Sequence, residues 1–242
     1  MTSSRFDMPS PSTANQRKKS RAAAVIFSLL ALSTLLAADL PGVPFHPDES
    51  TLLMMSADFE LLWREPLSLA YRPELAGDPQ MRYRGIDAPL ARYGIGLGRA
   101  LAGMPAPQVD WDWSASWEAN RGWGAVPSPG LLFAGRLFTA GLIPLGLVGL
   151  YLAARQVTSA RGSLASAFFL GSNALVLLHA RRAMAEAPLI FGVAAFLGSL
   201  GYSRRFPWLL GLAAALAFNA KHSALALLPV GLLAVAWQSA WH

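Results

Sequence analysis

Cysteine is absent from the 242-residue chain, so the protein has neither a disulfide framework nor a thiolate metal site. Charge is also scarce, because Asp, Glu, Lys and Arg together make up 14% of the residues, against about 25% in an average protein. Long runs of Ala, Leu, Gly and Val replace the missing charge, and 54% of the residues are hydrophobic. This composition is typical of a polytopic membrane protein rather than of one or two soluble domains.

Acids are the scarcer charged class, and the net charge is +6 with a pI of about 10.2. In a soluble protein such a balance would indicate a nucleic-acid partner. Here the basic residues flank apolar runs, where they are typical of membrane topology signals. We therefore expect a membrane protein with no nucleic-acid partner.

The amino-terminal residues 1–21 are polar and end in a basic cluster, which predicts a disordered cytoplasmic tail. Residues 22–38 form an apolar run of 17 residues, near the lower limit for crossing a bilayer. A secretory signal peptide has the same order of basic and apolar segments. We prefer an uncleaved first helix, because the preceding tail is long and residues 36–39 match a small-x-small cleavage site poorly.

Residues 39–130 hold twelve of the fourteen acids of the chain and no Lys, and we expect them to form a large loop outside the cytoplasm. Apolar residues recur at roughly helical spacing over 49–63 and again over 90–104. This spacing predicts two amphipathic helices that lie along the membrane surface, with Arg92 and Arg99 on the polar face of the second.

Four tryptophans follow within the same loop, at Trp111, Trp113, Trp117 and Trp123. Such a cluster is typical of an aromatic belt at the level of the lipid headgroups. Platforms on which a sugar ring stacks are the alternative interpretation.

The rest of the chain is nearly continuous apolar sequence, and it predicts further spans at 131–154, 163–180, 187–202, 206–220 and 223–241. Together with the first, they give an all-α fold with about six transmembrane helices. With the amino terminus inside, the positive-inside rule places the basic breaks at 155–161 and 203–205 in the cytoplasm. The breaks at Arg181-Arg182 and at Lys221 then face outside with the acidic loop, where their positive charge needs another explanation.

Four groups of polar residues are expected on that outer face: His46-Pro47-Asp48-Glu49, Asp87, Arg181-Arg182 with Glu186, and Lys221-His222. Adjacent carboxylates at the mouth of a membrane are costly unless they serve a function. A carboxylate accepts the proton of an attacking hydroxyl, while Arg and Lys hold a phosphate and stabilise the charge that develops as it leaves.

Each group also has a purely structural interpretation. Asp48 and Glu49 would cap the surface helix, and Glu186 would be an ordinary acid of a first helical turn. Arg181 and Arg182 would bind lipid phosphates, Lys221-His222 would snorkel to the interface, and His46 would be a loop residue.

At these residues the chain resembles the GT-C membrane glycosyltransferases, and more narrowly the protein O-mannosyltransferase and aminoarabinose transferase group (glycosyltransferase family 39-like). The resemblance covers about residues 22–242, the expected GT-C-like domain. It depends on short motifs in a fixed order: His46-Pro-Asp-Glu49, Asp87-Ala-Pro-Leu-Ala-Arg-Tyr93, Arg182-Ala-Met-Ala-Glu-Ala-Pro188 and Phe218-Asn-Ala-Lys-His222. Many members have a His-Pro-Pro-Leu-Gly-Lys-like stretch where this chain has Asp87-Ala88 and Arg92.

The resemblance implies an inverting transfer outside the cytoplasm, at the plasma (inner) membrane, from a polyprenyl-phosphate sugar to a hydroxyl of a lipid, glycan or protein acceptor. Asp48 maps onto the general base, with Glu49 beside it and Glu186 as the acid of the second outer loop. His46, Asp87, Arg92, Arg181, Arg182, Lys221 and His222 are the expected substrate-binding residues.

Relatives of this group have more spans, so we expect this chain to be the amino-terminal part of a longer transferase or a shortened relative. No dedicated cofactor or metal site is expected, although a divalent metal held by Glu49 and Glu186 stays open. A non-catalytic membrane subunit or a transporter-like protein is the alternative function.

Overall fold

The computed structural model describes residues 11–75 and 77–240, with the backbone alone for 11–22, 36 and 238–240. Helices make up 73% of the chain, and the described residues contain no strand, so the helical class is as predicted. Part of the predicted disordered tail, residues 1–10, lies outside the described residues. From Pro11 onward the backbone is helical, so the basic segment belongs to the first helix.

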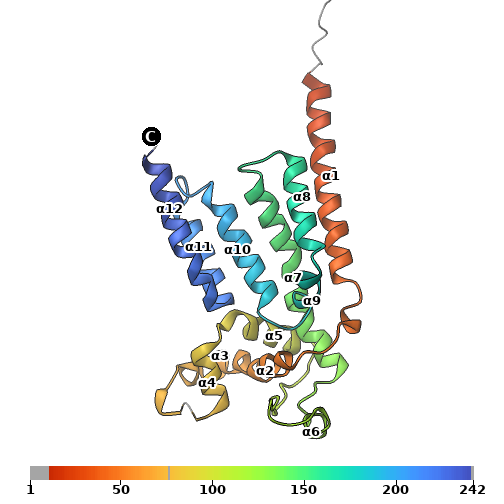
Figure 1. Ribbon diagram of the computed structural model, residues 1–242, viewed down its shortest axis with the longest axis vertical. Helices are drawn as coiled ribbons and strands as arrows, with labels where there is room; N and C mark the ends of the chain where they lie inside the picture. Colours follow the sequence, from red (N-terminus) through yellow and green to blue (C-terminus); the bar gives the residue numbers. More distant parts are fainter. Residues whose placement is uncertain (1–10, 76, 241–242) are drawn as a thin grey trace, which may run out of the picture.

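The molecule has two layers (Figure 1). One layer is a bundle of helices standing side by side: α1 (Pro11–Ala37), α7 (Pro129–Ala154), α8 (Ala160–Gly171), α10 (Glu186–Leu200), α11 (Pro207–Ala220) and α12 (Leu227–Ala240). The other is a layer of short helices across one end of the bundle: η1 (Leu40–Gly42), α2 (Pro47–Met55), α3 (Asp58–Arg64), η2 (Pro66–Leu69), η3 (Pro73–Leu75), α4 (Pro79–Ile86), α5 (Pro89–Leu101) and α6 (Trp117–Gly122).

Helix α7 is the centre of the packing, since it contacts α10 and α8 in the bundle and α5 in the short-helix layer. Small residues let α10 approach its neighbours closely. A Cβ atom on Gly192 would lie 2.6 Å from the Cα atom of Ala217 in α11, and one on Gly149 of α7 would lie 3.1 Å from the carbonyl carbon and from the Cβ atom of Ala194 in α10. These approaches hold the start of α10 and the end of α11 side by side, where the site described below is formed.

The prediction of about six membrane spans is wrong. Within the described part of the chain, only α7 is long and apolar enough to cross a membrane. In its most apolar stretch of 18 residues, 28% is buried inside the protein. The predicted span 163–180 is divided into α8 and α9 (Ala174–His179), because the Asn173 side chain accepts backbone hydrogen bonds from Leu175 and Val176 and starts a new helix. Helices α10 and α11, with 15 and 14 residues, are shorter than the roughly 20 residues that a span requires.

The predicted final span, 223–241, also has a different structure. It begins with the short 3₁₀ segment η4 (His222–Ala226) before α12 starts. This stretch, α10 and α11 are apolar helical segments of only 10–17 residues each. Apolar composition correctly predicted helices here, but not helices of transmembrane length.

The predicted surface helix 49–63 is two helices, α2 and α3, with a break after Met55. The break is covered by Arg99 of α5. The Arg99 guanidinium donates hydrogen bonds to the Ser56 hydroxyl at 3.0 Å and to the Ser56 carbonyl at 3.3 Å. Leu53 and Met55 are also buried, at 0% and 1% exposure. The first part of the segment therefore belongs to the protein core, whereas Leu62 and Trp63 at its end are exposed.

The second predicted surface helix, 90–104, corresponds to α5, but its arginines are not on a solvated face. Arg99 is 2% exposed and its Nη2 atom lies 2.6 Å from a carboxylate oxygen of Glu60. Arg92 is 5% exposed and its Nε atom lies 3.2 Å from Asp58, which also pairs with Arg84 at 2.6 Å. Buried ion pairs of this kind join α3, α4 and α5 into one unit.

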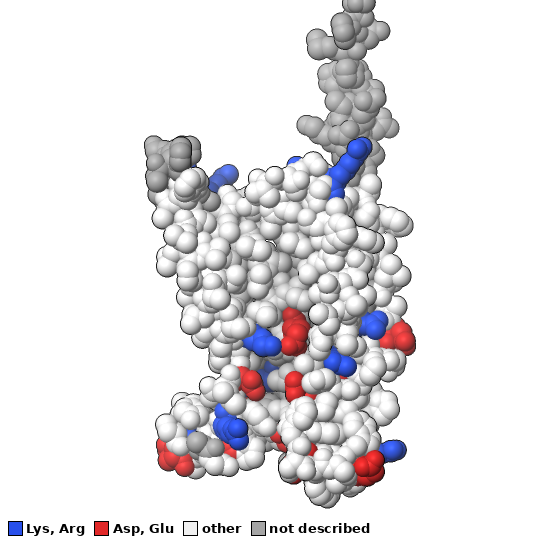
Figure 2. Space-filling view, viewed as in Figure 1, with Lys and Arg blue, Asp and Glu red and all other residues white. Residues whose placement is uncertain are grey.

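Charged side chains are unevenly distributed over the molecule. Figure 2 shows that on one face they gather over the short-helix layer and the adjoining ends of the long helices, while the sides of the bundle are nearly free of charge. The basic connections 155–161 and 201–206 lie at the opposite end of the bundle from the short-helix layer (Figure 1). The chain therefore has an acidic, chemically varied end and a basic end.

Candidate functional site

A cavity of about 420 Å³ lies where the short-helix layer meets the ends of α10 and α11. Its polar wall comes from segments far apart in the sequence: Asp48 and Thr51 from α2, Tyr83 and Asp87 from α4 and its end, Glu186 from the start of α10, and Lys221 and His222 from the connection after α11. The remaining lining residues are Leu52, Ile86, Ala88, Trp113, Met184, Ala185, Ala220 and Ser223. The structure thus brings together five of the ten predicted site residues, namely Asp48, Asp87, Glu186, Lys221 and His222.

The start of α2 fixes the position of Asp48. His46 is the N-cap residue, and its Nδ1 atom accepts the backbone N–H of Asp48 at 3.2 Å. The Glu49 side chain accepts the backbone N–H of His46 at 3.1 Å, which completes a capping box, and Pro47 occupies the first helical turn. These interactions leave the Asp48 side chain half exposed at the cavity, while His46 serves the helix end and does not line the cavity.

Glu49 is fully buried beneath the cavity and has different partners from Asp48. Its two carboxylate oxygens accept hydrogen bonds from Arg136 of α7 at 2.8 and 2.7 Å, and one of them also accepts the backbone N–H of Ala183 at 2.8 Å. Arg136, which sequence analysis did not single out, also donates to the carbonyls of Leu40 and Val43 at 2.9 Å each. The pair connects α2, α7 and the 180–185 segment, so its geometry is that of a structural ion pair.

Asp87 lies just before α5 and lines the cavity together with Asp48 and Glu186. Burial raises the pKa of Asp87 above its ordinary value, and the charge of Asp48 raises it further. The positive charges of Arg92, His222 and Lys221 act against this rise. Asp87 therefore lies in a drier position than the half-exposed Asp48.

Glu186 and Lys221 form an ion pair across the cavity wall, with 3.1 Å between Oε1 and Nζ. The second oxygen of Glu186, Oε2, is buried and has no hydrogen-bond partner. A hydroxyl or ammonium group of a ligand in the cavity would supply that partner. Nearby, the His222 Nδ1 atom lies 3.0 Å from the carbonyl oxygen of Ile86, and the His222 ring packs on Phe218 with a centroid distance of 5.0 Å.

Three predicted cationic residues do not reach the cavity. Arg182 is 7% exposed and donates to the Pro44 carbonyl at 3.2 Å, and Arg181 donates to the Ala38 carbonyl at 3.0 Å. Arg92 donates to the carbonyl of Asp87 at 3.2 Å, so it supports the cavity wall from behind. Of the predicted phosphate-binding cations, Lys221 is the one that lines the cavity.

Sequence analysis missed a second polar group, centred on Asp110. Its Oδ1 atom accepts the Thr51 hydroxyl at 2.6 Å and the Trp111 backbone N–H at 2.7 Å, and its Oδ2 atom accepts the Tyr83 hydroxyl at 2.7 Å. Burial, followed by the hydrogen bond to Asp110, raises the pKa of Tyr83 to about 12. Nothing in the spacing of Thr51, Tyr83 and Asp110 along the chain signals that they meet.

The described residues contain no group of three or more His, Asp or Glu side chains arranged to hold a metal ion. In particular Glu49, one of the two acids considered as metal ligands, is committed to Arg136. The donor set therefore does not fit a divalent metal, and no step of the chemistry below uses one.

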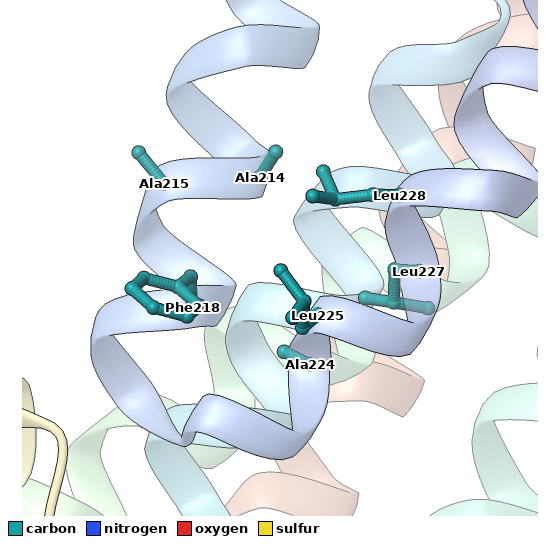
Figure 3. A pocket seen from close by; sticks show the side chains of 7 residues that line it. All are labelled: Ala214, Ala215, Phe218, Ala224, Leu225, Leu227 and Leu228. Atoms are coloured by element: carbon teal, nitrogen blue, oxygen red, sulfur yellow. The ribbon is translucent and has the colours of Figure 1, made fainter.

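A second cavity, of about 250 Å³, lies between α11 and the segment formed by η4 and the start of α12, and all its lining residues have apolar side chains (Figure 3). Ala214, Ala215 and Phe218 of α11 face Ala224, Leu225, Leu227 and Leu228. None of these side chains can transfer a proton or bind an ionic group, so the polar cavity is the candidate site.

The chain matches no protein-family model, no curated protein and no solved structure.

Proposed function

We propose that the protein is a glycosyltransferase that moves a sugar from a polyprenyl-phosphate donor to an acceptor hydroxyl within this cavity. The observation that supports it is the meeting of Asp48, Asp87 and the Glu186–Lys221 pair around one space of about 420 Å³. That volume lies in the range of about 300–1,000 Å³ typical of small-molecule sites. Carboxylates suit sugar hydroxyls, and a lysine suits a phosphate.

In the proposed reaction, the acceptor oxygen attacks the anomeric carbon of the donor sugar while its proton passes to the carboxylate of Asp48. A new bond forms between the anomeric carbon and the acceptor oxygen, and the bond from that carbon to the phosphate oxygen breaks. The electron pair leaves with the polyprenyl phosphate, so no general acid is required. Attack from the face opposite the phosphate inverts the anomeric centre.

Lys221 and Glu186 would change partners when the donor binds. A donor phosphate competes with Glu186 for the Lys221 ammonium, and the Lys221 charge stabilises the phosphate as it leaves. Glu186 then has both oxygens free for sugar hydroxyls, which would satisfy the buried Oε2 atom. Asp87, which also lines the cavity, is placed to hydrogen bond with the sugar hydroxyls.

A lipid-linked donor requires that the cavity be reached from a membrane. Helix α7 is long and apolar enough to cross one, and it begins beside the layer that carries the cavity. We therefore propose a membrane location, with the cavity layer at the membrane surface and the sugar acceptor a lipid, a glycan or a protein.

The test is sugar transfer by the full chain in membranes supplied with labelled polyprenyl-phosphate hexoses and pentoses. Asp48→Asn keeps the shape of the side chain and removes the base, so it should lower the transfer rate by about a hundredfold or more. Asp39→Asn is the matched control, because Asp39 is exposed, lies outside the cavity and has a left-handed backbone (φ 55°) that Asn tolerates. Equal rates for the two variants, or no transfer from any donor by the unmodified chain, would overturn the proposal.

A further inference from the structure

Trp113 stands at the mouth of the cavity with an indole that is 68% exposed. Its neighbours in the sequence are firmly held. Asp112 exchanges two hydrogen bonds of 2.8 Å with the buried Asn120 side chain, and the Trp111 ring packs edge-on to Trp113 with a centroid distance of 6.4 Å. Trp113 is therefore an exposed aromatic surface on a loop whose neighbouring residues are fixed.

The loop that carries Trp113 is tied to the cavity wall by Asp110. This carboxylate binds Thr51 of α2 and Tyr83 of α4, both of which line the cavity, together with the backbone of Trp111. The position of the indole is therefore coupled to the same helices that position Asp48 and Asp87. The Tyr83 hydroxyl stays protonated over the physiological range, so it remains a donor to Asp110.

The other tryptophans of the loop have different surroundings. Trp111 packs against Trp117 at 5.3 Å and against Phe45 at 5.9 Å, so these rings form an aromatic cluster within the protein. Neither Trp117 nor Trp123 is among the residues that line the cavity. Trp113 is the member of the four that combines an exposed ring face with the carboxylate-lined space.

A pyranose ring has an edge of hydroxyls and a face of C–H groups that carry partial positive charge. An indole face carries partial negative charge and attracts such a surface, while carboxylates accept hydrogen bonds from the hydroxyls. Trp113 together with Asp48, Asp87 and Glu186 offers both kinds of contact in one cavity.

We propose that Trp113 stacks on the ring face of the transferred sugar and that Asp110 is the positioning residue that holds it there. The inference rests on the proposed glycosyl transfer for the identity of the ligand, and it assigns the sugar to the Trp113 side of the cavity. The polyprenyl phosphate is then left for the Lys221 side.

Sugar binding can be measured apart from catalysis. The full chain, kept in a detergent without a sugar headgroup, is titrated with methyl glycosides of glucopyranose, mannopyranose and arabinopyranose, and binding is followed by saturation-transfer NMR. Sorbitol serves as the control probe, because it has similar hydroxyls but no ring face. At least one glycoside should bind with transfer to its C–H face, and sorbitol should show none.

Trp113→Leu should weaken that binding roughly threefold to tenfold, and Trp113→Phe should weaken it less. Trp123→Leu is the matched control, since Trp123 is 56% exposed in the same region but does not line the cavity. Asp110→Ala should weaken binding as Trp113→Leu does, and Asp110→Asn, which keeps one acceptor oxygen, should restore part of it.

The inference is overturned if no glycoside binds, if sorbitol binds equally well, or if Trp113→Leu leaves sugar affinity unchanged. The labelled-donor assay separates this outcome from failure of the proposed function. If the unmodified chain transfers sugar and Trp113→Leu binds glycosides as well as the unmodified chain does, only the stacking role of Trp113 is rejected. If sugar binding depends on Trp113 but no donor supports transfer, the transferase proposal is rejected and the protein is a sugar-binding protein.

Discussion

The two adjacent acids at the start of α2 have opposite environments. Successive residues of a helix point about 100° apart, so one end of a helix can direct neighbouring side chains to different places. Asp48 faces the cavity with a half-exposed carboxylate, whereas Glu49 is fully buried against Arg136. Their joint appearance in the sequence therefore reflects two functions, one for the site and one for the fold.

Glu49→Gln should destabilise the protein by about 3–5 kcal/mol, because it leaves the Arg136 guanidinium buried without its counter-charge. Glu74→Gln, at an exposed position, should change the free energy of unfolding by less than about 0.5 kcal/mol. Denaturant unfolding followed by tryptophan fluorescence measures both. A Glu49→Gln variant as stable as Glu74→Gln would contradict the structural role given to this pair.

Asp87 predicts a dependence of stability on pH. An acid with a raised pKa in the folded state keeps its proton where the unfolded chain has lost it, so its contribution to stability declines as pH rises from the ordinary value of 3.8 through the folded pKa. Asp87→Asn removes this contribution, so the variant should gain stability relative to the unmodified chain across that interval.

Asp112→Asn provides the opposite case. Hydrogen bonds from Ser114 lower the pKa of Asp112 in the folded state below the ordinary value of 3.8. The ionised Asp112 carboxylate therefore contributes stability that is fully present above 3.8 and is lost as pH falls through the folded-state pKa. This variant should lose stability relative to the unmodified chain as pH rises through the interval below 3.8. Both predictions are tested by measuring the melting temperature of each variant and of the unmodified chain as a function of pH. A difference in melting temperature between Asp87→Asn and the unmodified chain that does not vary with pH would contradict the burial of Asp87.

At the scale of elements, apolar runs and turn residues predict most helices but not their lengths or surroundings. The run at 131–154 is α7 almost to the residue, because no internal cap interrupts it. The run at 163–180 divides at Asn173, whose capping hydrogen bonds outweigh its apolar neighbours. A single polar residue thus changes a predicted span into two short helices.

The arginines of α5 illustrate a second limit of sequence analysis. Spacing alone places Arg92 and Arg99 on a polar face, and the usual partner of such a face is water. In the structure this face is covered by α3, whose Asp58 and Glu60 supply the counter-charges. Pairing between distant elements decides burial, and local periodicity contains no information about it.

At the scale of the whole molecule, the site is produced by the meeting of four distant segments: α2, the end of α4, the start of α10 and the connection after α11. Sequence analysis selected Asp48, Asp87, Glu186, Lys221 and His222 because charged residues are rare in this chain and their positions at helix ends stand out. The same reasoning selected Arg181 and Arg182, which bind backbone carbonyls elsewhere, and it passed over Asp110, one acid among many in an acidic loop. Rarity identifies candidates, but only the packing of α2, α10 and α11 determines which of them share a cavity.

Chemical cross-linking tests that convergence most directly, because the chain has no cysteine and any introduced pair reacts alone. Leu52→Cys and Ser223→Cys place two thiols on the cavity wall, one from α2 and one from η4. Leu52→Cys with Val157→Cys is the control pair, since Val157 is exposed in the connection after α7, at the far end of the bundle. With a short bismaleimide, the structure predicts an intramolecular link between residues 52 and 223, identified by mass spectrometry of the joined peptides, and none between 52 and 157. Absence of the 52–223 link, or equal linking of both pairs, would contradict the shared cavity on which the proposed function depends.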